Sequence, residues 1–309
     1  MKFVTFEKKD GTIRTGILLN SDHIIDLYEA SNGELPESFL DFLDSSEINL
    51  EKTRNLVNLT EIDKGVYPIS AVKLMAPLPV PRSFRDFYAF EQHVKTARQK
   101  RGLDMIPEWY EIPVFYFSNH LAIKGPGEPI EKPLECKSLD YELELACIIG
   151  KQGKDIKAAD ADQYIFGYCI LNDWSARDLQ RKEMVVGLGP AKGKDFATSI
   201  GPWIVTKDEL EPLKRAKGFN LTMKAKVNGI PLSEGNVGDI YYSFGEMIER
   251  ASKGVSIYPG EIIGSGTVST GCILELGTSV HRWLLPGDQI ELEIEHLGVL
   301  ENTIVAEKR

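Results

Sequence analysis

The segment from Leu139 to Ile149, with the sequence LDYELELACII, constrains the fold of this chain more than any other segment. Acidic and apolar residues alternate in its first half, and its second half is an uninterrupted apolar run. Alternation with a period of two is typical of a β-strand, and an apolar run is typical of a strand that is covered on both faces. The segment therefore predicts a β-rich fold in which this strand passes from a polar edge into the core.

The same alternation places Asp140, Glu142 and Glu144 on one face of the predicted strand. Two carboxylates that lie two residues apart on a strand can converge on a hard cation such as Mg²⁺, Mn²⁺ or Ca²⁺, because these ions prefer oxygen ligands. The alternative is a solvated strand face, and residues 291–295 (ELEIE) repeat the pattern. Carboxylates that lead into a buried strand are costly unless they are paired or bound to metal, so the first pattern is the stronger candidate for a metal site.

The overall charge and the cysteine content exclude several classes of protein. The chain has 36 Lys and Arg against 46 Asp and Glu, a net charge of −10, which argues against a protein whose main task is to bind nucleic acid or an anionic membrane. The four cysteines form no C-x-x-C pair, so neither a disulfide scaffold nor a thiolate zinc site is expected. The chain lacks an apolar run long enough for a signal peptide or a membrane span, and we expect an intact, soluble, cytoplasmic protein.

The chain divides at a proline-rich segment. Residues 1–30 are typical of short strands with a turn, and a polar, helix-prone stretch follows to about residue 65. The prolines at positions 77, 79 and 81 then remove backbone donors and favour an extended path. We therefore predict a small N-terminal α+β domain over residues 1–76 and a larger domain over residues 77–309. Strands outnumber helices along the chain, which predicts an α+β fold.

The larger domain contains one predicted helix and a series of predicted strands. Residues 85–99 have a helix-compatible composition, which would put Asp86 and His93 on one helical face. The further expected strands cover residues 114–117, 139–149, 167–171, 203–206, 221–227, 262–264, 273–276 and 289–295.

Residues 172–180 (NDWSARDLQ) form a second polar group directly after an apolar strand. Either Asp173 or Ser175 could cap a helix there, and Asp173, Arg177 and Gln180 would then share one helical face. A carboxylate, a guanidinium and an amide would lie side by side at the end of a strand. The alternative is an ordinary N-cap with an i,i+4 ion pair, which is the more frequent arrangement for a single helix of this kind.

Taken together, these motifs resemble those of the fumarylacetoacetate hydrolase family over residues 77–290. The resemblance rests on the order and spacing of Asp86-Phe87-Tyr88 with His93, Pro113-Val114 with Tyr116, Glu142-Leu143-Glu144, Asn172-Asp173-Trp174-Ser175-Ala176-Arg177-Asp178 with Gln180, Gly193-Lys194, Gly266-Thr267 and Leu274-Glu275-Leu276. It implies a β-rich roll or barrel-like catalytic domain beside the small N-terminal domain, and it implies a homodimer.

The resemblance also implies a metal site. In that family a divalent cation is held by four carboxylates, which match Asp86, Glu142, Glu144 and Asp173. The implied cofactor is Mg²⁺ or Mn²⁺, with Ca²⁺ as a further candidate. Four carboxylates so close together would repel one another strongly, and a dication together with Arg177 and Lys194 would balance their charge.

The implied activity is that of a metal-dependent hydrolase acting on carbon–carbon bonds in ketonic substances, here a fumarylacetoacetate-like or acylpyruvate-like 1,3-diketo acid. His93, oriented by Glu275, would remove a proton from water, and the hydroxide would attack the distal carbonyl. The residues implied to stabilise the oxyanion or the enolate are Arg177, Gln180 and Lys194. The residues implied to bind the keto-acid substrate are Tyr88, Tyr116, Arg101 and Thr267.

Two other functions stay open at this point. The first is a lyase or isomerase of the same family, such as an oxaloacetate decarboxylase, a diketo-acid tautomerase or a sugar-acid dehydratase, which uses the metal without an attacking water. The presence of both His93 and Glu275 favours hydrolysis. The second is a metal-stabilised binding protein, against which the anion-stabilising residues argue. Met184 replaces a substrate-binding tyrosine of the animal enzymes, so the acyl group is open. The polar segment 95–102 fits a mobile lid and an exposed helix end equally well.

Overall fold

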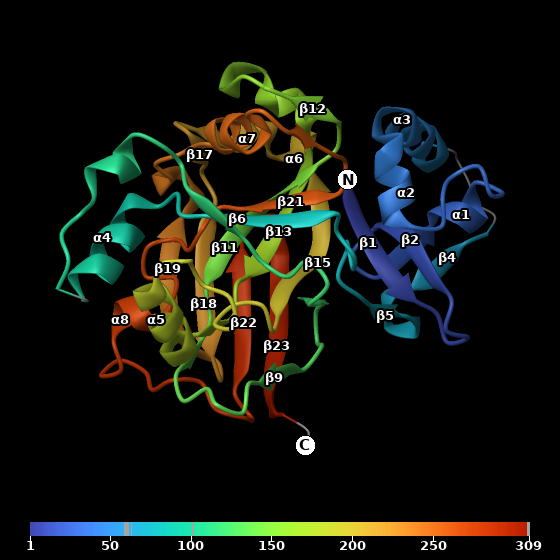
Figure 1. Cartoon of the computed structure of the whole chain (residues 1–309). Helices are drawn as coiled ribbons and strands as arrows, with labels where there is room; N and C mark the ends of the chain where they lie inside the picture. Colours follow the sequence, from blue (N-terminus) through green and yellow to red (C-terminus); the bar gives the residue numbers. More distant parts are fainter. Residues whose placement is uncertain (59–61, 63, 101, 308–309) are drawn as a thin grey trace.

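The computed structural model describes residues 1–58, 62, 64–100 and 102–307, and it has the α+β fold expected from the sequence (Figure 1). Within those ranges the larger sheet contains β1 (Lys2–Glu7), β2 (Ile13–Leu18), β3 (His23–Asp26), β4 (Val66–Pro68), β5 (Lys73–Leu74), β6 (Ser83–Phe87), β7 (Phe115–Phe117), β8 (Ile123–Lys124), β11 (Leu143–Ile149), β13 (Ile165–Asn172), β15 (Thr198–Thr206) and β21 (Glu261–Gly264). The smaller sheet contains β9 (Ile130–Lys132), β18 (Thr222–Val227), β19 (Ile230–Asn236), β22 (Gln289–Ile294) and β23 (Gly298–Ala306).

The remaining strands form two-stranded pairs, which are β10 (Leu139–Asp140) with β14 (Ser175–Ala176), β12 (Gly153–Lys154) with β20 (Ser256–Ile257), and β16 (Lys214–Arg215) with β17 (Gly218–Phe219). The α-helices are α1 (Leu27–Ala30), α2 (Phe39–Asp44), α3 (Ser46–Val57), α4 (Glu91–Gln99), α5 (Arg177–Val186), α6 (Lys207–Leu210), α7 (Phe244–Ser252) and α8 (Ile273–Leu276). The 3₁₀ helices are η1 (Ile69–Ala71), η2 (Pro107–Tyr110), η3 (Ala158–Tyr164), η4 (Glu211–Leu213) and η5 (Val237–Asp239). Among the described residues, no helix has the length and apolar character needed to cross a membrane.

Strand β11 contains the apolar run singled out in the sequence, and its two faces are buried in different cores. It pairs antiparallel with β13 on one side and with β21 on the other, and β6 runs parallel to β21. Leu145 and Cys147 pack in one core with Leu292 of the smaller sheet, whereas Ala146 and Ile148 pack in a second core on the opposite face. Because both faces are covered, the strand has no polar side after its first residues.

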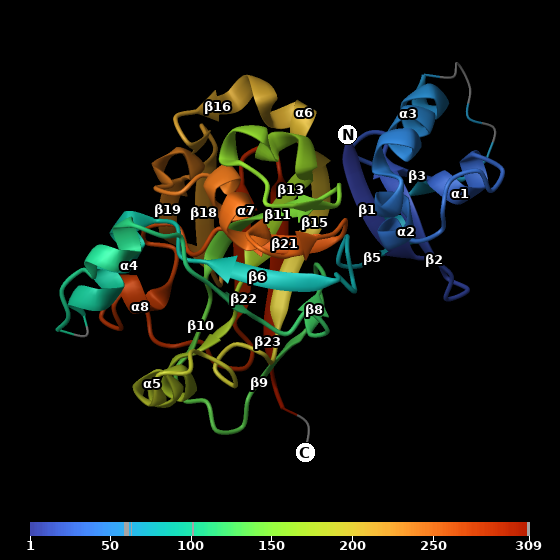
Figure 2. The ribbon, with the colours of Figure 1, turned by 45° about the horizontal axis from the view of Figure 1, so that its top comes forward.

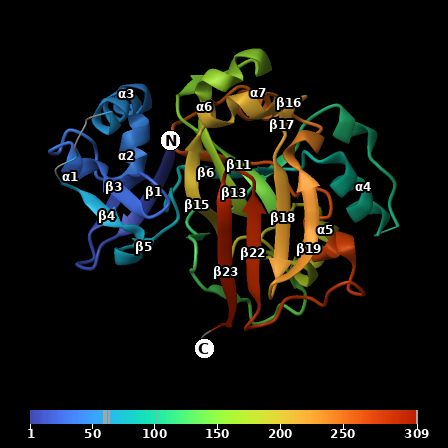
Figure 3. The ribbon, with the colours of Figure 1, turned by 180° about the vertical axis from the view of Figure 1, so that it is seen from behind.

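The smaller sheet covers one face of the larger sheet. Figure 3 shows β18, β22 and β23 in front of β11 and β13, and residues of both sheets share the largest apolar core. In β22, Ile290, Leu292 and Ile294 are buried, while Glu291 and Glu293 lie on the outer face. The second acidic alternation of the sequence is therefore a solvated strand face, in contrast to the first.

The N-terminal segment extends the larger sheet. Strand β1 pairs antiparallel with β15, with Phe3 opposite Ile204, and β2, β3 and β4 continue the sheet outward. Phe39 and Phe42 of α2 pack against the rings of Phe3 and Phe166 in the second core. Figures 1 and 2 show these blue elements at one side of the molecule. The boundary between domains 1–76 and 77–309 stays a prediction.

The predicted helix over residues 85–99 is wrong at its start. Asp86 lies in strand β6, and helix α4 begins only at Glu91. Backbone pairing of β6 with β21 and with β7 holds this segment extended, and such long-range pairing outweighs local composition. Asp86 and His93 therefore belong to different elements and do not share a helical face.

The predicted strand over residues 273–276 is also wrong, because this segment is the short helix α8. The carboxylate of Asp140 accepts hydrogen bonds from its first two amides, those of Ile273 at 2.8 Å and Leu274 at 3.0 Å. These are the donors that a helix N-terminus leaves without a partner inside the helix. A side chain distant in the sequence therefore stabilises a helical turn that the local pattern does not indicate.

Helix α5 begins later than the cap predicted at Asp173 or Ser175. Its first residue is Arg177, and Ala176 precedes it without a side-chain cap. Ser175 is instead part of strand β14, which pairs with β10. Asp173 therefore lies before the helix, and it does not share a helical face with Arg177 and Gln180.

Candidate active site

Three of the predicted metal ligands come together where β6, β11 and β13 lie near one another. Asp86 is on β6, Glu144 is on β11, and Asp173 follows β13. Their carboxylate oxygens lie within 4.8 Å of one another, and each of the three residues is buried. Strand β21 lies between β6 and β11 in the sheet, and Figure 2 shows β6 beside β21. We call these three residues the acidic triad.

A glycine in the strand between β6 and β11 makes room for the acidic triad. Gly264 of β21 is opposite Asp86 on one side and Ala146 on the other. A Cβ atom at Gly264 would lie 2.5 Å from Asp86 Oδ1 and 3.2 Å from Glu144 Oε2. The two carboxylates can approach each other because this position carries no side chain.

We expect Gly264→Ala to weaken binding of a divalent cation by at least about tenfold, because the added methyl group would displace Asp86 from its partners. Calorimetric titration with Mn²⁺ would measure the change. Ile262→Val, a conservative change in the same strand, is the control. Equal Mn²⁺ affinity of Gly264→Ala and the unchanged protein would contradict the role given to this glycine.

The charges of the acidic triad are unfavourable in the absence of a cation. Burial raises the pKa of Asp86, Glu144 and Asp173, and neighbouring carboxylates raise it further. Two buried oxygens, Asp86 Oδ1 and Asp173 Oδ1, have no hydrogen-bond partner. An all-oxygen set of this kind fits Mg²⁺, Mn²⁺ or Ca²⁺. Such a cation would offset the negative charge, and both oxygens could coordinate it.

Glu142, the fourth predicted ligand, is held by two cationic side chains. Arg177 Nη2 donates to its Oε1 at 2.8 Å, and the Lys194 ammonium bridges its Oε2 and Asp173 Oδ2. Burial favours the neutral acid, yet Arg177 and Lys194 hold the pKa of Glu142 well below its usual range. A metal ion that used all four carboxylates would therefore have to displace Lys194 from its position between Glu142 and Asp173.

Asp140 is a further residue of the site to which the sequence analysis gave no role. It is fully buried, and it accepts a hydrogen bond from Arg177 Nε at 2.9 Å in addition to those from the first amides of α8. One carboxylate therefore positions both Arg177 and the helix that carries Glu275. The alternation that placed Asp140 on the same face as Glu142 was the signal that could have found it.

We expect Asp140→Asn to lower kcat about tenfold to a hundredfold while the protein stays folded. An amide keeps the shape of the carboxylate, but its NH₂ group cannot accept the hydrogen bonds that hold Arg177 and α8. Steady-state kinetics at saturating Mg²⁺ would measure the change, with the exposed Asp160→Asn as the control. An unchanged kcat would show that Asp140 does not position the site.

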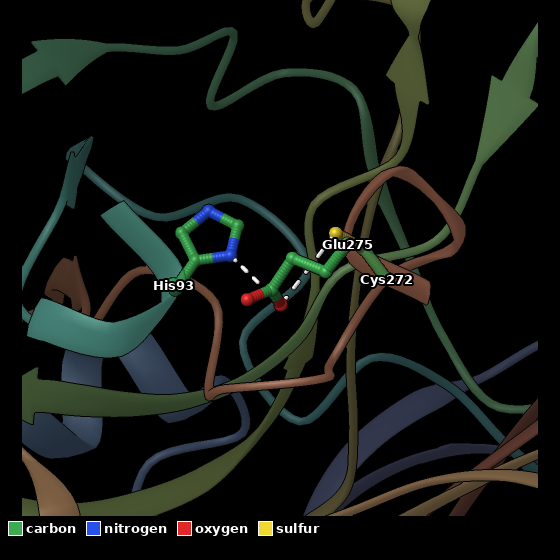
Figure 4. A group of neighbouring side chains, drawn as sticks. All are labelled: His93, Cys272 and Glu275. Carbon is green, nitrogen blue, oxygen red and sulfur yellow. Dashed lines mark hydrogen bonds and ion pairs between the residues drawn. The ribbon is translucent and has the colours of Figure 1, made fainter. Parts of the chain in front are cut away.

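His93 of α4 and Glu275 of α8 form a second buried group beside the acidic triad. His93 Nδ1 lies 3.0 Å from Glu275 Oε2 (Figure 4). The ring of Tyr88 packs edge-on against the imidazole, with ring centroids 5.4 Å apart. Because Nδ1 faces Glu275, Nε2 is the nitrogen left for a substrate. The pair is therefore arranged as a general base with an orienting carboxylate.

A cavity of about 910 Å³ reaches both groups, with Asp86, Glu144 and His93 in its lining, whereas Asp173 and Glu275 do not line it. The predicted site residues that line it are Asp86, Tyr88, His93, Tyr116, Glu142, Glu144, Arg177, Gln180, Lys194 and Thr267. Arg101, predicted to bind substrate, lies outside the described residues. Leu103, Val114 and Met184 add an apolar wall.

Two residues predicted to bind substrate line the cavity and also contact the acidic triad. The Tyr116 hydroxyl donates to Asp173, and Thr267 Oγ1 lies 3.4 Å from Glu144 Oε1. Gln180 Oε1 accepts from Arg177 Nη1 at 3.2 Å, which links it to the cationic side of the cavity. In this structure Tyr116, Thr267 and Gln180 therefore support the charged groups.

Comparison with known proteins gives consistent matches over most of the chain. A family model described as fumarylacetoacetate (FAA) hydrolase C-terminal matches residues 82–305. The oxaloacetate tautomerase YisK of Bacillus subtilis (strain 168) is 30% identical, over 98% of this chain and 100% of its own. The mitochondrial oxaloacetate tautomerase FAHD2A of Bos taurus is 32% identical, over 93% of this chain and 85% of its own. The solved fumarylacetoacetate hydrolase of Exiguobacterium antarcticum has a TM-score of 0.75 at 26% identity, covering 99% of this chain and 100% of that chain.

Proposed function

Because the chain belongs to the fumarylacetoacetate hydrolase family, we propose that it is a divalent-cation-dependent tautomerase of a small 2-keto dicarboxylic acid, with oxaloacetate as the first substrate to test. The observation that carries the proposal is the buried His93–Glu275 pair, whose imidazole lines the same cavity as Asp86 and Glu144 of the acidic triad. Two relatives that match nearly the whole chain bear the name oxaloacetate tautomerase. These names favour the isomerase alternative of the sequence analysis over its hydrolase.

Keto–enol tautomerisation needs a proton carrier and stabilisation of negative charge, and it needs no attacking water. A divalent cation at the acidic triad would supply Lewis-acid stabilisation of the 2-keto oxygen. His93 Nε2 would take a proton from C3, and the electron pair of that C–H bond would form the C2–C3 double bond. His93 would then return the proton to the C2 oxygen, so nothing is consumed. Glu275 would stabilise the imidazolium through Nδ1.

The cationic side chains of the cavity fit an anionic substrate. Arg177 and Lys194 line the cavity, and each is already paired with Glu142. They would bind substrate carboxylates through charge-assisted hydrogen bonds and so hold C3 within reach of His93. Burial strengthens such contacts because water does not compete with them.

Hydrolytic carbon–carbon cleavage is the second candidate, since an oriented His–Glu pair can also activate water. The cavity of about 910 Å³ has room for such a water and for a diketo acid larger than oxaloacetate. The expected homodimer, the cytoplasmic location and the choice among Mg²⁺, Mn²⁺ and Ca²⁺ stay predictions.

The test follows the enol form of oxaloacetate by its ultraviolet absorbance, with chelated protein and after Mg²⁺ or Mn²⁺ is restored. We expect metal-dependent acceleration of enol–keto exchange beyond the rate in buffer with metal alone, loss of this acceleration in His93→Ala, and retention in the exposed His296→Ala. Acetylpyruvate and carbon dioxide release are assayed in parallel by mass spectrometry. Cleavage of acetylpyruvate without tautomerase activity would move the function to the hydrolase, and no acceleration of exchange would overturn the proposal.

A further inference from the structure

A second set of metal-ligating atoms surrounds the His93–Glu275 pair. His93, Cys272 and Glu275 are all buried, and one ligand atom from each lies within 4.8 Å of the others (Figure 4). Glu275 Oε2 lies 3.0 Å from His93 Nδ1 and 3.9 Å from Cys272 Sγ. Cys272 directly precedes α8, so the helical turn brings it to the same side as Glu275, and α4 supplies His93 from a distant part of the chain.

The donor atoms of this group differ in kind from those of the acidic triad. An imidazole nitrogen, a thiol sulfur and a carboxylate oxygen together suit Zn²⁺ and other soft or borderline cations, whereas Mg²⁺ prefers oxygen alone. In a tetrahedral zinc site with bonds of about 2.0–2.3 Å, the ligand atoms lie roughly 3.3–3.8 Å apart. Two of the separations, 3.0 Å and 3.9 Å, lie close to this range, and the third, between the His93 nitrogen and Cys272 Sγ, is within 4.8 Å, so metal binding requires the side chains to draw together.

The hydrogen bonding of His93 leaves a ligand atom available. Although His93 Nδ1 is close to Glu275, it is buried and makes no well-directed hydrogen bond. His93 also lines the cavity, whereas Cys272 is fully buried behind it, so an ion would approach the group from the His93 side. A dication bound to a thiolate, a carboxylate and a neutral imidazole carries no net charge, which suits a buried position.

We propose that His93, Cys272 and Glu275 form an inhibitory site for Zn²⁺ or a similar soft dication, distinct from the acidic triad. On binding, the Cys272 thiol releases its proton to solvent and the sulfur forms a bond to the metal. Nδ1 of His93 ligates the metal through its lone pair, so a neutral ring carries its proton on Nε2. The nitrogen assigned as the base then has no lone pair for the substrate, and turnover stops.

The binding part of this inference is independent of the proposed function, and the inhibition part rests on it. Binding is measured with Cd²⁺, whose bond to a thiolate gives an ultraviolet charge-transfer band, on protein saturated with Mg²⁺. We expect one band per chain, its displacement by Zn²⁺, and its loss in both Cys272→Ser and Cys272→Ala. The control Cys147→Ser changes a buried cysteine in the core of β11 and should keep the band. Absence of the band, or its persistence without Cys272, would overturn the site.

Inhibition is measured with Zn²⁺ on the Mg²⁺-saturated enzyme. We expect Cys272→Ser to keep the basal turnover and to raise the Zn²⁺ concentration for half inhibition by at least about tenfold, because one ligand is lost. Equal inhibition of both proteins would place the inhibitory Zn²⁺ elsewhere, at the acidic triad for example, and would overturn the proposal. If the proposed function fails instead, tautomerase activity is absent while the Cd²⁺ band of Cys272 remains.

Discussion

Glu144→Gln is expected to lower metal-dependent turnover by at least about a thousandfold. The amide keeps the size of the side chain but removes a negative ligand from the acidic triad. It also replaces one of the oxygens that contact the Gly266 amide at 3.1 Å and Thr267 Oγ1 at 3.4 Å. Lewis-acid stabilisation by a bound cation is worth several kcal/mol, and each ~1.4 kcal/mol corresponds to a tenfold change in rate.

The same substitution should change stability in opposite directions with and without metal. Burial, with Asp86 and Asp173, raises the pKa of Glu144 well above its ordinary value. The folded state therefore binds this proton more tightly than the unfolded state, and its ionised form costs stability as the pH rises above the ordinary pKa. Glu144→Gln removes that cost, so the metal-free variant should unfold at the same temperature as the unchanged protein or a higher one at neutral pH.

With metal present, the order should reverse. A ligand at a hundred times its Kd stabilises a folded protein by about 2.7 kcal/mol, and the variant should lose most of this gain. Thermal unfolding of both proteins with and without Mn²⁺ measures the two effects together. Glu293→Gln is the matched control. Glu293 belongs to the second acidic alternation of the sequence, and it lies on the exposed face of β22. Retained Mn²⁺ stabilisation and turnover in Glu144→Gln would contradict the metal site.

Local patterns in the sequence were sufficient for the central part of the fold. The run Ala146–Ile149 is apolar because both faces of β11 are covered, and this requirement is visible in the sequence itself. Glu142 and Glu144 were recognised by their spacing and by their position before that run. Glu291 and Glu293 have the same spacing, but only one face of β22 is buried. The isoleucine and leucine side chains of this strand face the core, and the two glutamates lie on the outer face.

Long-range contacts account for what the local patterns missed. Asp86 is extended because β6 pairs with β21 and β7, although its neighbours in sequence are compatible with a helix. Helix α8 forms where Asp140 accepts from its first amides, and no residue inside α8 indicates this. The approach of Cys272 to His93 depends on both α4 and α8, so cysteine spacing alone could not predict it.

The largest expected loss of stability comes from Arg177→Met. Arg177 is 5% exposed, and its guanidinium donates to Asp140 at 2.9 Å and to Glu142 at 2.8 Å. Methionine fills a similar volume but leaves two buried carboxylates without their main cation. Removing one partner of a buried ion pair typically costs about 3–5 kcal/mol, far more than the pair itself contributes relative to apolar residues. Turnover should fall as well, because the guanidinium proposed to bind a substrate carboxylate is absent from the variant.

Denaturant unfolding with saturating Mg²⁺ measures this loss, and Arg54→Met is the control. Arg54 lies 3.8 Å from Asp208 with both side chains about half exposed, so its loss should change stability by less than about 1 kcal/mol. Arg177→Lys should recover only part of the stability, because one ammonium cannot reproduce the two directed contacts of the guanidinium. Adding Asp140→Asn to Arg177→Met should also restore part of the stability, since it removes one of the carboxylates left without a partner. Equal unfolding of Arg177→Met and Arg54→Met would show that Asp140 and Glu142 do not depend on Arg177.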